Sequence, residues 1–137
     1  MKNNIDKEIS EKIFGVYRKM KQGFNSLKKI NITMIQLHAL IFIKENKNCQ
    51  LTDLAKSFSI TLPTANSLIE KLVNLKLVSR KNDKDDRRII HLFLTDKGIK
   101  TLKKIENERV NCFSSVISKL NNEEKKQLLK ILEKISS

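Results

Sequence analysis

Apolar residues recur along most of this chain at the spacing of helices that bury one face. From Ile5 to Ile30 they fall at positions 5, 9, 13, 16, 17, 20, 24 and 27, which predicts one long helix. A helix of this length in a small chain needs more apolar surface to pack on than one compact lobe offers. We therefore expect it to pack against a second copy of the chain, the alternative being that it lies across its own domain.

A second helix is predicted from Thr33 to about Glu45, because Thr33 and Gln36 have the spacing of a capping box. Its middle, residues 37–43, is apolar nearly all round, so we expect it to be the buried spine of the domain. After a turn at 46–48 and a short strand at 49–51, Thr52 is predicted to cap a brief helix over 53–58.

The central helix of the pattern is predicted over residues 61–77. Thr61 has the side chain of an N-cap, and Pro63 lies in the first turn, where a missing N–H costs nothing. Apolar residues at 65, 68, 69, 72, 73 and 75 form the buried stripe. Only Ser59 and Ile60 separate it from the brief helix before it, so the pair forms a predicted helix-turn-helix.

The other face of this helix is polar. Small hydroxyl and amide side chains near a helix N-terminus suit base edges in a DNA groove, and the free N–H groups there attract phosphate. The alternative is an ordinary amphipathic helix whose polar face meets water. On the first interpretation the DNA-contacting residues are Pro63, Thr64, Asn66, Ser67 and Lys71, with Lys71 assigned to phosphate.

A hairpin is predicted next. Residues 78–81 and 89–94 flank the charged turn 82–88, which indicates a wing with a basic tip. Thr95 or Asp96 then caps a predicted helix to about Leu120, and Asn121 with Glu124 starts the last helix. The predicted fold class is mainly α with a small β-wing (α+β): a winged helix-turn-helix lobe flanked by N- and C-terminal helices.

Charge indicates the class of partner. Twenty-eight Lys and Arg against fifteen Asp and Glu leave a net charge of +13, which favours a polyanionic partner. Nucleic acid is the first candidate. An anionic membrane surface is the second, disfavoured because the charge is not gathered on one amphipathic helix. With neither a leader-like segment nor an apolar run of membrane-spanning length in the sequence, we expect a cytoplasmic protein.

Residues with catalytic or ligating chemistry are few. The sequence offers no nucleophile with a base, carboxylate pair or glycine-rich phosphate loop, so we expect neither an enzyme nor a cofactor. His38 and His91 lie in no cluster of metal-ligand spacing, and His38 is interpreted as a core or groove-lining residue. Cys49 and Cys112 lack CxxC spacing and lie among apolar residues, which favours structural thiols over an oxidation switch.

The most specific motif lies in the wing. Asp86-Arg87-Arg88 is followed by Leu94-Thr95 and then Lys97-Gly98, which resembles the wing signature of the MarR family of bacterial transcription regulators. Residues 33–40, 54–55 and 72–80 resemble the family's other landmarks, so the resemblance covers essentially the whole chain. One departure is Lys76, where the family usually has Gly. A lysine there costs about 1 kcal/mol if its φ is positive.

The resemblance implies a homodimer whose terminal helices interlock and whose two winged lobes bind successive major grooves of a palindromic operator. It also implies that Arg88 enters the minor groove, held in place by Asp86. A carboxylate two residues from an arginine can order that side chain before binding, the alternative being an exposed ion pair that contacts nothing. Lys84 and Arg87 are assigned to DNA backbone contacts or to solvated charge.

The resemblance further implies an effector site, because relatives often bind small aromatic acids in a crevice between the dimer helices and the winged lobe. The candidate residues for a small aromatic or anionic effector are Tyr17, Met20, Phe24 and His38. A stripe of methionine and aromatic residues at helical spacing is also typical of a core, and this alternative stays open.

The predicted function is a sequence-specific DNA-binding transcription regulator, a repressor released by a small-molecule effector. Residues 1–32 and 96–137 are assigned to dimerisation and residues 33–95 to DNA binding, within a single MarR-type domain. The alternatives are a non-specific architectural DNA-binding protein and a thiol-based, redox-responsive regulator. Competition with bulk genomic DNA separates the architectural protein from the sequence-specific one.

Overall fold

The structure is a computed structural model that describes residues 3–23 and 25–137. The chain divides into two compact units. One is Ser26–Glu106, here called the winged unit, and the other is Met1–Asn25 with Asn107–Ser137, here called the terminal-helix unit. Each unit is described by itself below. No helix in the described part of the chain has both the length and the apolar character to cross a membrane.

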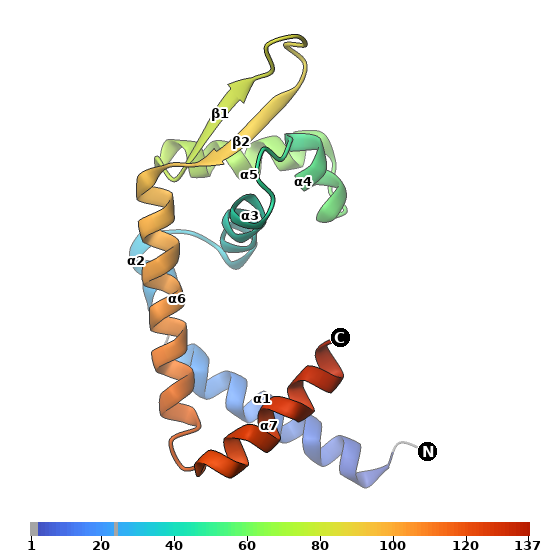
Figure 1. Ribbon diagram of the computed structural model, residues 1–137, viewed down its shortest axis with the longest axis vertical. Helices are drawn as coiled ribbons and strands as arrows, with labels where there is room; N and C mark the ends of the chain where they lie inside the picture. Colours follow the sequence, from blue (N-terminus) through green and yellow to red (C-terminus); the bar gives the residue numbers. More distant parts are fainter. Residues whose placement is uncertain (1–2, 24) are drawn as a thin grey trace. The chain divides into compact units, whose positions relative to one another are not determined.

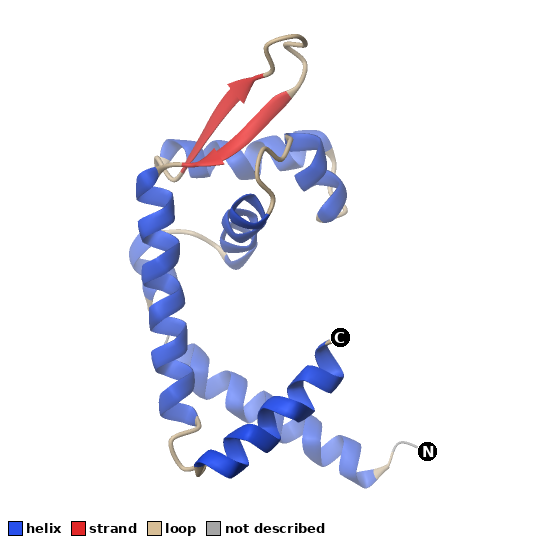
Figure 2. Ribbon diagram, viewed as in Figure 1, coloured by secondary structure: helices blue, strands red, loops and turns tan. Residues whose placement is uncertain are grey.

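The winged unit contains helices and one hairpin in the predicted order (Figure 1). Two strands, β1 (Val78–Asn82) and β2 (Ile90–Leu94), pair antiparallel (Figure 2). Val78 lies opposite Leu94. The third strand predicted at residues 49–51 is reduced to a single bridge between Gln50 and His91. Its elements are α2 (Ser26–Ile30), α3 (Met34–Glu45), α4 (Leu51–Ser57), α5 (Leu62–Asn74), β1 (Val78–Asn82), β2 (Ile90–Leu94) and the first part of α6 (Asp96–Val116).

The core of the winged unit is aliphatic. The predicted stripe of α5 is confirmed, since Ala65, Ile69 and Leu72 are completely buried. Burying one such large side chain contributes about 1.5–3 kcal/mol, so this stripe fixes which face of α5 turns outward. The largest fully buried side chains come from α3, α4, α5, both strands and the loop between α5 and β1: Leu40, Leu54, Ile69, Leu72, Leu77, Val78 and Leu92.

The terminal-helix unit consists of α1 (Asn4–Gly23), the end of α6 and α7 (Asn122–Ser136). None of the residues that the structure describes in this unit is buried. Large apolar side chains remain exposed on both helices: Ile5, Ile9, Ile13, Phe14, Val16 and Tyr17 on α1, and Leu129, Ile131, Leu132 and Ile135 on α7. A stripe of this kind is stable in water only when another apolar surface covers it.

The prediction of one helix from Ile5 to Ile30 is wrong. Helix α1 ends at Gly23 and α2 begins at Ser26. The backbone N–H of Asn25 donates to the carboxylate of Glu108 (2.9 Å) instead of continuing a helix ladder. Glycine has a low helix propensity, so Gly23 favours the end of α1 at this point. The apolar spacing continues past the end of the helix, which is why one long helix was predicted.

Two other helix ends also differ from prediction. Helix α4 begins at Leu51, with Gln50 and not Thr52 at the N-cap, and the Gln50 N–H donates to the Asp53 carboxylate (2.8 Å). Helix α6 ends at Val116, short of Leu120. The capping residues predicted for the other helices, Thr33, Thr61 and Asn121, are confirmed.

Helix α5 ends in a Schellman motif built without glycine. Lys76 has φ of 60°, and the N–H groups of Lys76 and Leu77 donate to the carbonyls of Val73 and Leu72, both at 2.9 Å. The positive φ that makes lysine unfavourable here is therefore present, at a cost of about 1 kcal/mol. Helices α2 and α4 end in the same way at Asn31 and Ser59.

The start of α6 is joined to this end of α5. The Thr95 hydroxyl donates to the Lys76 carbonyl (2.5 Å), and Lys97 Nζ donates to the Leu75 carbonyl (3.1 Å). The Thr95 oxygen also accepts the N–H of Gly98 (3.0 Å), and a Cβ on Gly98 would overlap the carbonyl oxygen of Leu77. The Thr and Gly of the wing signature therefore form the joint between α5 and α6.

Candidate nucleic-acid interface

The exposed face of α5 carries the side chains predicted to contact DNA. Pro63, Thr64, Ser67 and Lys71 are exposed, whereas Asn66 is half-buried. Thr61 Oγ1 accepts the backbone N–H of Thr64 (3.3 Å), and the two hydroxyl groups lie 2.8 Å apart. The first turn of α5 therefore presents an ordered hydroxyl beside N–H groups that the helix leaves unpaired.

Arg80 is part of this surface and was missed by the sequence analysis. Its guanidinium donates to the backbone carbonyl of Asn66 (3.3 Å), and its Nε is buried without a hydrogen-bond partner. Side chains two apart on a strand share a face, so Arg80 lies on the side of the buried Val78. That alternation is the signal that places Arg80 against α5.

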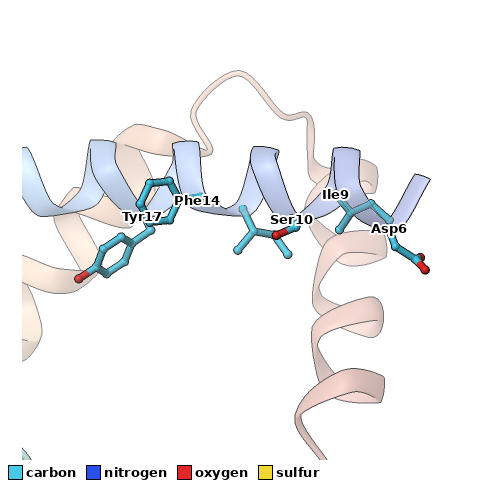
Figure 3. Close-up of a pocket in the computed structure, with 6 residues that line it drawn as sticks. Asp6, Ile9, Ser10, Phe14 and Tyr17 are labelled. Carbon is cyan, nitrogen blue, oxygen red and sulfur yellow. The ribbon is translucent and has the colours of Figure 1, made fainter. Parts of the chain in front are cut away.

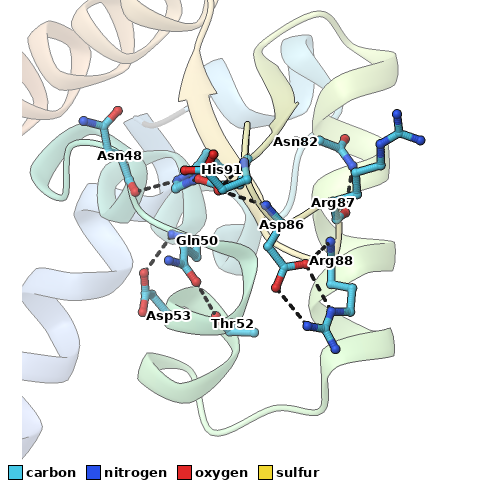
Figure 4. Close-up of polar contacts among 11 residues, drawn as sticks. Asn48, Gln50, Thr52, Asp53, Asn82, Asp86, Arg87, Arg88 and His91 are labelled. Atoms are coloured by element: carbon cyan, nitrogen blue, oxygen red, sulfur yellow. Dashed lines mark hydrogen bonds and ion pairs between the residues drawn. The ribbon is translucent and has the colours of Figure 1, made fainter.

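The tip of the wing holds Arg88 in a two-point contact with Asp86. Arg88 Nε and its terminal nitrogen donate to the two carboxylate oxygens of Asp86, both at 3.1 Å, while the Arg88 side chain is 90% exposed. The guanidinium, followed by the Arg88 backbone N–H, lowers the pKa of the Asp86 carboxyl. The contact between Asp86 and Arg88 on which the predicted ordering depends is thus present in the structure (Figure 4).

The turn between the strands is folded around Asp83. Its carboxylate accepts the backbone N–H groups of Asp85 (3.1 Å) and Asp86 (3.2 Å). The Asn82 side chain donates to the carbonyl of Arg87 (2.9 Å) on the other side of the turn. Lys84 and the Arg87 side chain are left exposed, as expected of residues assigned to DNA backbone contacts or to solvated charge.

His91 connects this turn to the loop between α3 and α4. Nε2 lies 2.9 Å from a carboxylate oxygen of Asp83. Nδ1 lies 3.2 Å from the carbonyl oxygen of Asn48 (Figure 4). The bond to Asp83, followed by the bond to Asn48, raises the pKa of His91, and the same contact lowers the pKa of Asp83. No role for His91 can be predicted from the sequence, because Asn48 lies far from it along the chain and Asp83 reaches it across the hairpin.

The candidate effector residues are distributed over both units. Tyr17 is exposed on α1, with its ring centroid 6.2 Å from that of Phe14, and Met20 is half-buried on the same helix. Phe24 lies outside the described residues. His38, on α3, is exposed rather than buried in the core. It borders an open hollow of about 360 Å³ in the winged unit, lined by Ile35, His38, Ile41, Phe42, Glu45 and Phe58.

A second hollow follows one side of α1 (Figure 3). All the residues that line it belong to this single helix: Asp6, Ile9, Ser10, Ile13, Phe14 and Tyr17. A ligand site encloses most of its ligand's surface, which one helix cannot do. The hollow is therefore an open face of α1 and not a built ligand site.

The cysteine thiols have different surroundings. Cys49 is buried in the winged unit, and this burial, with the Asp53 carboxylate as a second cause, raises the pKa of its thiol. A raised pKa disfavours the reactive thiolate. Cys112 is half-buried on α6. Within the described residues no group of three or more His, Cys, Asp or Glu side chains is arranged to hold a metal ion.

Comparison with known proteins matches residues 32–90 to the MarR family model. The regulator BilQ of Clostridium symbiosum, named as an HTH-type transcriptional regulator, is 32% identical over 81% of this chain and 77% of BilQ. The transcriptional repressor MprA of Escherichia coli is 29% identical over 79% of this chain. This chain spans 61% of the length of MprA.

The similarity extends to solved structures. A mutant of MepR from S. aureus, bound to an oligodeoxyribonucleotide, matches 93% of this chain and 94% of MepR, with a TM-score of 0.73 and 28% identity. This match extends over more of the chain than the region of the family model. Together with the joint at Thr95 and Gly98, these similarities show that the chain belongs to the MarR family.

Proposed function

We propose that the protein is a sequence-specific DNA-binding transcription regulator that binds a palindromic operator as a homodimer and represses the adjacent genes. The observation that carries this proposal is the ordered and exposed Arg88, held out by Asp86 on the same unit as the polar face of α5. The names of the relatives support it, since they are regulators and repressors, and the similar MepR structure contains DNA. Membership of this family identifies a regulator and not an enzyme.

In this proposal the polar face of α5 and the wing contact different grooves of the DNA. Thr64, Asn66 and Ser67 reach base edges in the major groove, while Lys71 neutralises a phosphate. Arg88 enters the minor groove, where negative potential is focused in A·T-rich sequences. The exposed positions of Pro63, Lys84 and Arg87 suit contacts to the sugar-phosphate backbone.

The proposed homodimer follows from the terminal-helix unit. Its apolar side chains on α1 and α7 are exposed in the single chain, and a second copy offers a matching surface. Residues 1–32 and 96–137 are accordingly proposed to form the dimer, and residues 33–95 to bind DNA. Two lobes held by one interface place half-sites about one helical turn apart. A regulator that binds chromosomal DNA acts where that DNA is, so the proposed compartment is the cytoplasm.

The test begins with selection of bound sequences from random double-stranded DNA. We expect an inverted repeat to be recovered. Affinity for this operator is then measured at several salt concentrations for wild type, Lys71→Ala and Arg88→Ala. Lys71→Ala should weaken binding to all sequences and reduce the salt slope by about one. Arg88→Ala should in addition relax the preference for A·T-rich flanks.

Lys125→Ala, an exposed lysine of α7, is the matched control and should leave the operator affinity unchanged. Operator affinity that stays unchanged in both Lys71→Ala and Arg88→Ala would overturn the assignment of these residues. Recovery of no common sequence, with equal binding to bulk genomic DNA, would instead support a non-specific architectural protein.

We also propose that a small aromatic or anionic effector regulates binding, with Tyr17, Met20, Phe24 and His38 as candidate residues. The supporting observation is the hollow beside His38, bordered by the rings of Phe42 and Phe58, which pack edge to face with centroids 5.9 Å apart. Benzoate titrated into the protein–operator complex should release DNA, and His38→Ala should raise the concentration required. Release at the same concentration in both proteins would contradict the assignment of His38.

A further inference from the structure

The wing is tied to the helix-turn-helix by the ring of His91. One ring nitrogen contacts the carbonyl of Asn48, in the loop before α4, and the other contacts the carboxylate of Asp83, in the wing turn. We propose that His91 is a positioning residue for DNA recognition, which holds the wing turn, and with it Arg88, in place relative to the helix-turn-helix. This inference rests on the proposed DNA-binding function.

A continuous series of contacts leads from His91 to Arg88. The Asp83 carboxylate that contacts His91 also accepts the backbone N–H of Asp86 (3.2 Å), which fixes the position of that residue. The Asp86 carboxylate in turn accepts the backbone N–H of Arg88 (2.9 Å) and both ends of its guanidinium fork. Each group in the series is ordered by the one before it, so loss of the first contact loosens the last.

The two partners of His91 define its protonation state. A carbonyl oxygen and a carboxylate oxygen are both acceptors, so both ring nitrogens have to donate if both contacts are to be hydrogen bonds. Only the doubly protonated, positively charged imidazolium has two N–H groups. These two hydrogen bonds of His91, here called the tie between the wing and the loop, are therefore both formed only when His91 is protonated.

The charged groups around the ring agree with this state. Asp83 faces it from the wing turn and Asp53 from α4, and both favour the positive form. Lys81 lies directly opposite His91 on β1, but its Nζ is placed over the ring of Phe93 at 5.4 Å from the centroid. The pKa of His91 is accordingly raised above its ordinary value of 6.5.

The sign of the pH dependence follows. Because the pKa of His91 is raised on folding, the tie is fully present below pH 6.5 and is lost as pH rises through the higher pKa of the folded protein. Asp83, whose pKa is lowered, gives the opposite limit, since the tie is lost as pH falls through the pKa of its carboxyl. Operator affinity that depends on Arg88 should therefore decrease on the alkaline side.

The experiment measures operator affinity from pH 6 to pH 9 for wild type, His91→Gln, Arg88→Ala and the double variant. His91→Gln should weaken binding roughly three- to tenfold at pH 6 and remove the alkaline decrease. In the Arg88→Ala background, His91→Gln should have almost no further effect, because the residue it positions is gone. Lys47→Gln, which removes a positive charge from the same loop, should keep the wild-type pH profile.

Several outcomes would overturn the proposal. An unchanged pH profile in His91→Gln would do so, as would an equal loss of affinity with and without Arg88, which indicates a general structural role. Asp83→Asn provides a second variant if His91→Gln folds poorly, and circular dichroism measures the folded fraction of each. If wild type shows no operator preference at any pH, the proposed function fails and this inference fails with it. If wild type binds a specific operator but His91→Gln changes neither the affinity nor the pH profile, only this inference fails.

Discussion

The two units of this chain contrast in how they are stabilised. In the winged unit helices α3, α4, α5 and α6 and both strands contribute to a buried aliphatic core, and all buried apolar residues of the described chain lie between Ile32 and Ile105. The terminal-helix unit has comparable apolar side chains, but its described residues are all at least partly exposed. The winged unit buries its apolar side chains within a single chain, whereas the terminal-helix unit leaves its own exposed.

This difference separates two kinds of stability. Substitutions in the winged unit should change the free energy of unfolding by an amount that does not depend on protein concentration. Substitutions in the terminal-helix unit should act through association, and their effects should depend on concentration.

Leu54→Ala should cost about 2–5 kcal/mol, because it leaves a cavity in a completely buried site of the winged unit. Denaturant unfolding at two protein concentrations measures the loss, which should be the same at both. Leu132→Ala on α7 is the matched variant, since Leu132 is 40% exposed. Its loss should be small at a concentration where the chains are dissociated and should grow as the concentration rises. Equal, concentration-independent losses would mean that the terminal-helix unit has a core of its own.

Gly98→Ala should cost about 1–3 kcal/mol, because the added Cβ forces α6 away from the carbonyl of Leu77. Gly15→Ala is the control in the terminal-helix unit, where a Cβ meets nothing within 4 Å. That replacement removes a glycine from a helix interior and should stabilise by about 0.5–1 kcal/mol. Thermal unfolding of both variants checks the pair, and a neutral Gly98→Ala would contradict the joint described between α5 and α6.

Ile13→Asp should weaken self-association at least about tenfold, a loss of roughly 1.4 kcal/mol, because it places a charge on the apolar face of α1 in both copies. Sedimentation equilibrium measures the effect. Lys12→Asp is the control, because it introduces the same residue one position earlier in place of an exposed lysine. It should leave association nearly intact. Equal association of the two variants would place the dimer contact away from this face of α1.

Lys76→Gly should stabilise the winged unit by about 0.5–1 kcal/mol, since glycine adopts the positive φ of this position without strain. The net gain in free energy is the relief of backbone strain minus the cost of the greater conformational entropy that glycine gives the unfolded chain. Denaturant unfolding measures it, and the gain should not change with protein concentration. A destabilised variant would show that the lysine side chain makes a contribution greater than the strain of its backbone.

Local signals predicted much of this structure. The caps at Thr33, Thr61 and Asn121 depend on residues three positions apart, and the buried stripe of α5 depends on helical period, so both can be recognised in sequence. The end of α1 and the start of α2 were not predicted, because the helical spacing of apolar residues continues from one helix into the next. Gln50 was missed as an N-cap because Thr52 has the more usual capping side chain.

The site shows the same limit. The contact between Asp86 and Arg88 spans two residues and was predicted, whereas His91 meets partners at positions 48 and 83 through the folding of the sheet. Strand alternation places Arg80 on the buried side of β1, but it does not identify the partner of Arg80, Asn66, which lies on another element. Contacts between distant segments depend on tertiary packing, which periodicity alone does not describe.

The joint at Thr95 has a mechanical consequence. The carbonyls of Leu75, Lys76 and Leu77, which end α5, are all bonded to Thr95 or Lys97 at the start of α6. The first turn of α6 is therefore linked to the residues that follow α5 through three hydrogen bonds. We therefore expect a change in direction of the first turn of α6 to alter the direction of the polar face of α5.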